Sequence, residues 1–431
     1  MLGKQLLPMD TVQLGLEFPS SHDIYTNFKG DSLSQPIPAS IIISRRDKTA
    51  LNRPCHIRVC LVQRLSSRAR DGADDNEDIL SRVYNHLLSK PQLNKSFVTR
   101  SCSVIEELSL QLPDFLEGTH VENIQKVPFY MPILANIPGT TITGIGKISY
   151  FLIASMVTED NSLVGTSKEI FLRRRTLLEQ DSIQHTRIYP NSSWITKIIL
   201  SQNGTETADS TFFITAKIFL RWTATPAGRS TEFKCVAIRG LRWRIEEVAT
   251  LESRPGGENN PENGSVEEKS VVRELSNGIQ KGYWGTLHNP ILANNQTHQQ
   301  KDSAVDVAFE VNIPSAVEPA PEVEPSNYEF QSLSPDYLPR SLQEKFTFLA
   351  KDRTFLTTEH RLKLDILISE DTFDISSRKL VDRKPMRTAL NASFPLRIVD
   401  KAEAHIDEMI LTGNLPRYQE VSDSPPNYEI F

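Results

Sequence analysis

Apolar and polar residues alternate with a period of two along most apolar segments of this chain. From Val12 to Phe18, leucines alternate with glutamine, glycine and glutamate. A period of two places one face of a β-strand in a core and the other in solvent, so the pattern predicts a protein built mainly of strands. The same pattern recurs at these apolar positions: Ile57, Val59, Leu61; Phe212, Ile214, Ala216, Ile218, Leu220, Trp222; Leu241, Trp243, Ile245; Val305, Val307, Phe309, Val311; and Leu362, Leu364, Ile366, Ile368.

One stretch has helical spacing instead. Residues 77–89 follow the capping candidates Asp75 and Asn76 and precede Pro91, which are typical start and stop signals. The apolar positions recur three and four residues apart: Ile79, Leu80, Val83, Tyr84, Leu87 and Leu88. We interpret this segment as a helix packed on a sheet, in preference to a membrane- or partner-binding helix.

The length of 431 residues is too great for one core and predicts two or more domains. We expect two antiparallel, immunoglobulin-like β-sandwiches over residues 1–175 and 176–400, followed by a flexible tail over 401–431. Residues 253–269 are polar and rich in Gly and Pro, and residues 314–326 are rich in Pro and Glu. We interpret the first as a mobile loop and the second as a semi-extended connection.

Composition and charge narrow the class of protein. The net charge of −6 gives no support to nucleic-acid binding. Residues 1–10 lack the features of a secretory signal, and no apolar run approaches the roughly 20 residues that cross a bilayer. The four cysteines (Cys55, Cys60, Cys102 and Cys235) are few and scattered, as is typical of reduced cytosolic thiols. We therefore expect a cytoplasmic protein.

Motifs for catalysis, cofactors and metals are absent from the sequence. It contains no Gly-rich phosphate loop, zinc-type spacing, Gly-x-Ser-x-Gly elbow or kinase signature. Cys55 and Cys60 fall on opposite faces of an expected strand, which argues against a shared metal. His360 lies on an expected strand, and the pattern places no nucleophilic residue beside it, so we interpret it as structural. We expect no catalytic residue, no cofactor and no metal.

A run of three arginines follows the expected end of the first domain. Arg173, Arg174 and Arg175 come directly after the apolar residues Ile170 to Leu172. Such a run fits either a patch for lipid headgroups or the solvated face of a domain junction. We favour the junction.

Two short motifs near the end of the chain point to a binding partner. Pro425-Pro426-Asn427-Tyr428 is a Pro-Pro-x-Tyr sequence, and Leu415-Pro416-Arg417-Tyr418 is a weaker version of it. Adjacent prolines favour the polyproline II helix, which fits the aromatic groove of a WW domain while the tyrosine fills a neighbouring pocket. A random chain of this length with 26 Pro and 10 Tyr would contain on average about 0.04 Pro-Pro-x-Tyr sequences. We predict WW binding through Pro425, Pro426 and Tyr428, with Leu415, Pro416 and Tyr418 as the secondary site.

Residues 127–155 resemble the N-terminal domain of arrestins. They contain Pro128-Phe129, the turn residue Pro138 and the strand Gly146-Lys147-Ile148-Ser149-Tyr150-Phe151-Leu152. The segment from His360 to Ile368, with its His-x-Leu-x-Leu pattern, and residues 392–399 resemble late strands of arrestin C-terminal domains. Together with the tail motifs, these features resemble the fungal α-arrestins, which are arrestin-related trafficking adaptors.

The resemblance implies an adaptor whose tail holds a HECT-type ubiquitin ligase through WW domains. The β-sandwich body would recognise cytoplasmic tails of membrane transporters or receptors, so that ubiquitin is attached to this cargo and endocytosis follows. The protein would then be recruited from the cytoplasm to the plasma membrane or endosomes, as a peripheral membrane protein. The alternative is an arrestin-like signalling or vesicle-coat scaffold whose WW partner is not a ubiquitin ligase. A stand-alone enzyme is the third and least favoured hypothesis.

Overall fold

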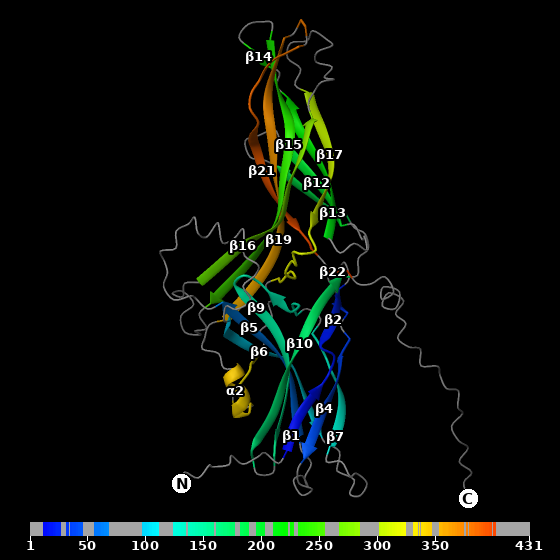
Figure 1. Ribbon diagram of the computed structural model, residues 1–431, viewed down its shortest axis with the longest axis vertical. Helices are drawn as coiled ribbons and strands as arrows, with labels where there is room; N and C mark the ends of the chain where they lie inside the picture. The colour runs from blue at the N-terminus through cyan, green and yellow to red at the C-terminus, as the bar shows by residue number, and fades with distance from the viewer. Residues whose placement is uncertain are drawn as a thin grey trace, which may run out of the picture.

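The computed structural model of the chain consists mainly of β-strands, which form two halves arranged along the long axis of the molecule (Figure 1). Each half has two sheets with an apolar core, so the prediction of an all-β fold with two β-sandwiches is confirmed. The structure describes these residues: 12–26, 32–33, 35–45, 56–68, 97–111, 124–134, 137–158, 161–176, 182–188, 195–202, 210–222, 225–227, 232–254, 267–284, 301–324, 331–334, 336, 338–346, 353–374, 376–377, 379–398 and 400–401.

The first half contains a small sheet and a large one. The small sheet has the antiparallel order β1 (Val12–Glu17), β4 (Ile37–Arg45) and β7 (Ile124–Met131). The large sheet has the order β18 (Gln331–Ser332), β6 (Phe97–Gln111), β5 (His56–Arg68), β9 (Gly146–Val157), β10 (Leu163–Thr176), β2 (Ser21–Thr26) and β3 (Ser32–Leu33), with β8 (Thr141–Ile142) on β9 and β22 (Asp400–Lys401) on β10. The pairs of β10 with β2 and with β22 are parallel, and the other named pairs of this half are antiparallel.

The second half also has two sheets, and their named pairs are antiparallel. One sheet has the order β11 (Ile183–Ile188), β12 (Ile195–Gln202), β13 (Ser210–Trp222) and β17 (Lys301–Ile313). The other has the order β14 (Thr225–Ala227), β15 (Glu232–Arg254), β19 (Arg353–Asp374) and β20 (Leu380–Arg383), with β16 (Glu267–Trp284) on β15 and β21 (Arg387–Leu396) on β19.

The predicted alternation holds in the strands that form the second core. In β13 the side chains of Phe212, Ile214, Ala216 and Ile218 are at most 1% exposed and face the core. Thr215 and Lys217, which alternate with them, are only partly buried. In β19 the core face is formed by Leu362, Leu364 and Ile366. Burial of such side chains stabilises each strand by about 1.5–3 kcal/mol per residue relative to exposure.

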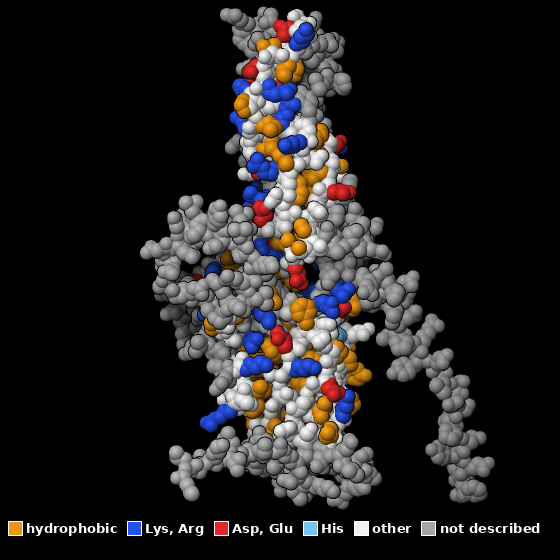
Figure 2. All heavy atoms as spheres, in the orientation of Figure 1, with side chains coloured by type: hydrophobic (Ala, Val, Ile, Leu, Met, Phe, Trp, Pro, Cys, Tyr) orange, Lys and Arg blue, Asp and Glu red, His pale blue; other side chains and the backbone are white. Residues whose placement is uncertain are grey.

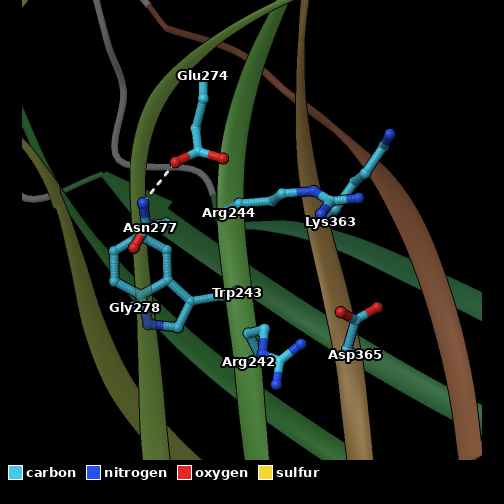
Figure 3. A pocket seen from close by; sticks show the side chains of 8 residues that line it. All are labelled: Arg242, Trp243, Arg244, Glu274, Asn277, Gly278, Lys363 and Asp365. Carbon is cyan, nitrogen blue, oxygen red and sulfur yellow. Dashed lines mark hydrogen bonds between the residues drawn. The ribbon is translucent and has the colours of Figure 1, made fainter. Parts of the chain in front are cut away.

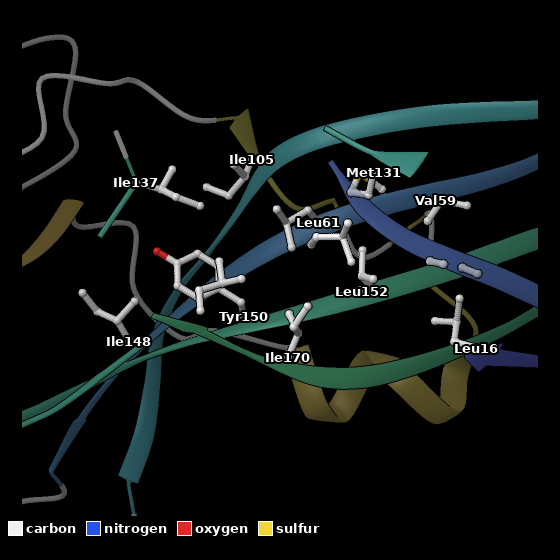
Figure 4. Packing of buried hydrophobic residues seen from close by; sticks show 14 of the residues in the cluster. Leu16, Val59, Leu61, Ile105, Met131, Ile137, Ile148, Tyr150, Leu152 and Ile170 are labelled. Carbon is white, nitrogen blue, oxygen red and sulfur yellow. The ribbon is translucent and has the colours of Figure 1, made fainter. Parts of the chain in front are cut away.

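Residues 127–155 form the strand, turn and second strand that the sequence predicts. The strands are β7 and β9, and Ile148, Tyr150, Leu152 and Ala154 all enter the first core. Figure 4 shows the Tyr150 ring among the apolar side chains of this core. The Tyr150 hydroxyl donates a hydrogen bond to the Pro138 carbonyl oxygen at 2.6 Å and accepts one from Gln63 Nε2 at 2.9 Å. The tyrosine therefore ties the Pro-containing turn to the sheet.

A segment between β17 and β19 crosses from the second half to the first. We call the described residues between Pro314 and Phe346 the strap. Val323 of the strap is buried in the first core, and its backbone forms two hydrogen bonds with Thr358 of β19, both 3.1 Å. Further along, the strap contributes β18 to the edge of β6.

The strap ends in the helix α2 (Arg340–Phe346), which covers the outer face of the large sheet of the first half (Figure 1). Phe346 packs edge-on against Phe151 of β9, with ring centroids 5.2 Å apart. Leu333, Leu338 and Phe346 of the strap join a third apolar cluster with these residues of the sheet: Cys60, Val62, Cys102, Phe151 and Ile153.

The structure tests only some of the remaining sequence predictions. The predicted helix at 77–89 lies outside the described residues. The predicted loop at 253–269 is shorter than expected, because β15 continues to Arg254 and β16 begins at Glu267. Residues 314–326 were predicted to be a semi-extended connection, and the described part of them, 314–324, contains one isolated bridge and no helix or strand. The helix α2 and the packing of the strap on the first half were not predicted. The domain ranges 1–175, 176–400 and 401–431 stay a prediction, although residues from beyond position 175 (Ala249, Val323 and Leu356) contribute to the first core.

Replacing Tyr150 by phenylalanine should destabilise the first half without changing its fold. The substitution removes both hydrogen bonds of a fully buried hydroxyl and leaves the Pro138 carbonyl and the Gln63 amide without this partner. We expect the free energy of unfolding to fall by about 1–3 kcal/mol, measured by urea denaturation. Tyr130→Phe is the matched control, because the Tyr130 side chain is exposed, and equal losses from both substitutions would contradict the role given to Tyr150.

Candidate functional site

The predicted WW-binding residues lie outside the described residues. These are Leu415, Pro416, Tyr418, Pro425, Pro426 and Tyr428. The last described residues, Asp400 and Lys401, form β22 and pair with Arg175 and Thr176 at the end of β10. The described chain therefore ends beside β10, close to the boundary between the two halves.

The arginine run of β10 forms ion pairs at this boundary. Arg173 Nε and Arg175 Nε lie 3.3 and 3.0 Å from the carboxylate oxygens of Asp23 on β2. Arg173 also donates a hydrogen bond to Ser21 Oγ at 2.9 Å. Burial lowers the pKa of Arg174, Glu324 of the strap raises it and Arg397 lowers it again, with a net decrease. The two ion pairs join β10 to β2 within the first half, and the interpretation of the run as a domain junction stays a prediction.

A buried polar cluster lies where the strap leaves the second half. Its centre is the Glu247 carboxylate of β15, which is 3% exposed and accepts hydrogen bonds through Oε2 from the Ala320 amide at 2.8 Å and from Arg273 of β16 at 2.7 Å. Arg273 also donates to the Glu318 carbonyl oxygen at 2.8 Å. The carboxylate therefore holds β16 and the strap to β15.

His360 of β19 completes this cluster. Its side chain is 0% exposed, and Nε2 lies 3.7 Å from Glu247 Oε2 while Nδ1 lies 3.6 Å from Glu322 Oε1 of the strap. Glu322 Oε2 in turn lies 4.0 Å from Arg397 Nε. We call Glu247, Arg273, Glu322, His360 and Arg397 the strap cluster.

Burial and charge act in opposite directions on the two central groups of the strap cluster. Burial lowers the pKa of His360, but the carboxylates of Glu247 and Glu322 outweigh it, so the pKa is raised above its ordinary value. Burial raises the pKa of Glu247, but His360, the Ala320 amide and Arg273 outweigh it, so the pKa is lowered. Both effects favour the charged pair.

A second buried carboxylate is satisfied by arginines. Asp371 of β19 is 0% exposed, and it accepts hydrogen bonds from Arg239 of β15 at 2.6 Å and from Arg383 of β20 at 3.0 and 3.1 Å. The Ser369 hydroxyl donates a further hydrogen bond to Asp371 at 3.2 Å. These contacts hold β20 to β19. Each oxygen of the Asp371 carboxylate accepts two hydrogen bonds, so its acceptor positions are taken by the protein.

A hollow of about 150 Å³ lies over β15, β16 and β19 of the second half (Figure 3). Two of the three cations that line it, Arg244 and Lys363, are paired with Glu246, at 2.8 and 2.7 Å. The residues around it are Arg242, Trp243, Arg244, Glu274, Asn277, Gly278, Lys363 and Asp365. More widely, Figure 2 shows cationic, anionic and apolar side chains interspersed over the visible face of both halves.

The side chains of Cys60 and Cys102 are buried, and Cys235 lies on β15. Cys60 and Cys102 lie in the apolar cluster beneath the strap, where burial raises the pKa of Cys60 to about 11 and that of Cys102 to about 12. Such thiols are poor nucleophiles near neutral pH. Within the described part of the chain, no group of three or more His, Cys, Asp and Glu residues could hold a metal ion. No helix of that part is long and apolar enough to cross a membrane.

Sequence reasoning found His360 but missed its partners. Glu247 and Glu322 are far apart in the chain, so their spacing carries no signal. A local signal was present, however, because Glu246 and Glu247 interrupt an otherwise apolar and alternating strand. Two acidic residues at such a place indicate a buried charge pair or the end of a core.

The chain was compared with known proteins in three ways. No protein-family model matches it, and no curated protein does. Among solved structures, squid arrestin is similar over 91% of this chain and 95% of its own, with a TM-score of 0.37 and 8% identity. The sporulation control protein Spo0M of Bacillus subtilis covers 49% of this chain and 80% of its own, with a TM-score of 0.19 and 9% identity. The native conformation of E. coli alpha-2-macroglobulin is similar over 91% of this chain and 21% of its own, with a TM-score of 0.22 and 10% identity. The two-sandwich fold is established by the strand pairings of this chain itself.

Replacing Gly278 by alanine should disturb the wall of the hollow. A Cβ atom at this position would lie 2.5 Å from Cζ2 of Trp243, whose indole packs against the glycine (Figure 3). We expect overpacking to lower the free energy of unfolding by about 1–3 kcal/mol and to change the fluorescence of Trp243. Gly144→Ala is the control, because the nearest atom to its Cβ would be 3.6 Å away, and an undisturbed Gly278→Ala protein would show that the indole moves freely.

Proposed function

We propose that this protein is an adaptor that recruits a WW-domain HECT-type ubiquitin ligase to cargo at the plasma membrane. The observation that carries the proposal is the Pro425-Pro426-Asn427-Tyr428 motif. Two adjacent prolines present a preformed polyproline II ridge, which loses little conformational entropy when it enters an aromatic groove. The ligase would ubiquitinate transporters or receptors bound by the body, and endocytosis would follow.

The two-sandwich body suits the cargo-binding part of this role. It is long, and its surface carries charged and apolar side chains side by side, which suits recognition of a cytoplasmic peptide or tail. The resemblance of residues 127–155 to arrestins supports the same reading. We propose that the protein is cytoplasmic and is recruited to the plasma membrane or endosomes by its cargo.

The position of the motifs fits a tethered ligase. Between Lys401 of β22 and Pro425 the sequence has 23 residues, which span at most about 80 Å when fully extended. A ligase held at the motif would therefore stay within about 80 Å of β22, which lies close to the boundary between the two halves. A tether of this kind raises the effective concentration of the ligase at the cargo without any direct contact between them.

A pull-down with the intact protein tests the identity of the WW partner. We expect a HECT-type ligase to be recovered from cell extract by the wild-type chain and to be lost with Tyr428→Ala, because the tyrosine ring fills the pocket beside the groove. Tyr130→Phe serves as the control, since it lies on the body. Recovery of a WW protein that is not a ligase, again dependent on Tyr428, would favour the alternative of a signalling or vesicle-coat scaffold.

The two motifs should contribute unequally to binding. Six residues separate Tyr418 from Pro425, a gap of only about 25 Å, so two WW domains could engage both motifs only if they pack side by side. Leu415 replaces one of the two prolines in the first motif. We therefore expect Tyr428→Ala to cost far more affinity than Tyr418→Ala in calorimetric titration of the full chain with a tandem WW fragment. Equal losses would refute this ranking, and no binding by the wild-type chain would remove the adaptor proposal.

A further inference from the structure

We propose that His360 is a proton-controlled fastener of the strap, which ties the two halves together more firmly at acidic than at alkaline pH. The inference is independent of the WW motifs and of the proposed partner. It concerns the strap cluster, where β15, β16, β19 and the strap meet.

The geometry around His360 favours an imidazole that carries protons on both nitrogens. Each ring nitrogen faces a carboxylate oxygen, Nε2 toward Glu247 and Nδ1 toward Glu322, at 3.7 and 3.6 Å. A neutral imidazole has one nitrogen without a proton, which would then face a carboxylate acceptor with no donor between them. Only the cationic ring offers a proton to both carboxylates.

The other charged groups near the ring do not change this preference for the cationic imidazole. Arg273 of β16 is bound to Glu247, and Arg397, which follows β21, lies beside Glu322. The residue of β21 that pairs with His360 is Leu396, which is apolar. The histidine is thus the group whose charge changes near neutral pH and which contacts both the second half, through Glu247, and the strap, through Glu322.

The strap residues next to these contacts also anchor the first half. Val323 follows Glu322 directly, and it is buried in the first core while its backbone bonds to Thr358 of β19. The Ala320 amide donates to the same Oε2 atom of Glu247 that His360 faces. Loss of the proton would leave two buried or half-buried carboxylates across a neutral ring, which weakens the attachment of residues 318–323.

The direction of the pH dependence follows from the raised pKa of His360. A group whose pKa is higher in the folded state stabilises that state fully below its ordinary pKa, which is about 6.5 for histidine. This stabilisation is lost as the pH rises through the higher folded pKa. The lowered pKa of Glu247 keeps its carboxylate charged across the same range, so the strap is fastened in mildly acidic solution and loosens as the pH rises.

Hydrogen–deuterium exchange of the full chain measures the fastening directly. The readout is exchange in peptides covering residues 318–324, at about pH 5.5 and about pH 8, after correction for the intrinsic pH dependence of exchange and with β13 peptides as internal reference. At the lower pH we expect exchange to be roughly tenfold slower in the wild type than in His360→Gln, the effect of one lost charge-assisted contact. At the higher pH the difference between the two proteins should be smaller, because the wild-type imidazole loses its proton as the pH rises through its folded pKa.

Two further variants keep the result interpretable. Glu322→Gln removes one carboxylate from a half-exposed position and should reduce the pH dependence, even if His360→Gln fails to fold. Glu359→Gln is the matched control, because Glu359 precedes His360 on β19 and its side chain is 56% exposed, so this variant should behave as the wild type. Exchange that is independent of pH in the wild type, faster at the lower pH, or unaltered by both His360→Gln and Glu322→Gln would overturn the proposal.

Discussion

The antiparallel ladder between β15 and β19 is the interaction on which the rest of the structure depends. It pairs residues 232–254 with residues 353–374 with one irregularity, and at about 3.4 Å per residue it is roughly 75 Å long. One face of this ladder serves both halves of the molecule. The pair Ile245 and Leu362 lies in the second core, whereas Ala249 and Leu356 lie in the first. A single pair of strands thus fixes the distance and the orientation of the two cores.

The strap cluster lies on the stretch of this ladder between the two cores. Glu247 and His360 are directly paired in register between the two apolar stretches. A gap between two cores must be filled by side chains that satisfy one another, because buried polar groups without partners are costly. A cluster of this kind adds little net stability over an apolar filling. Its effect is to define where one core ends and the next begins.

How far the sequence predicts this structure depends on the distance between interacting residues. The alternation in β13 and β19, and the strand, turn and strand of 127–155, are local patterns and were predicted correctly. The helix α2 and the packing of the strap on the first half were not predicted, because the helix is short and the sheet face that it covers belongs to strands more than 150 residues away. One signal for it exists in β9, where Tyr150 to Ala154 are continuously apolar, as is typical of a strand covered on both faces. The WW motifs are also local patterns. They lie outside the described residues, so the prediction of WW binding depends on the sequence alone.

The strap also has a consequence for the order in which the chain is made. The apolar face of β5, β6 and β9 is complete once residue 157 has been synthesised, but the helix that covers it ends at Phe346. At about 5–20 residues per second, a ribosome needs roughly 10–40 s to produce the intervening chain. During this time Val62, Phe151 and Ile153 have no partner from the strap, and the nascent first half presents them to its surroundings. Until the second half is nearly finished, the nascent first half therefore exposes an apolar surface of the kind that makes folding intermediates prone to aggregation.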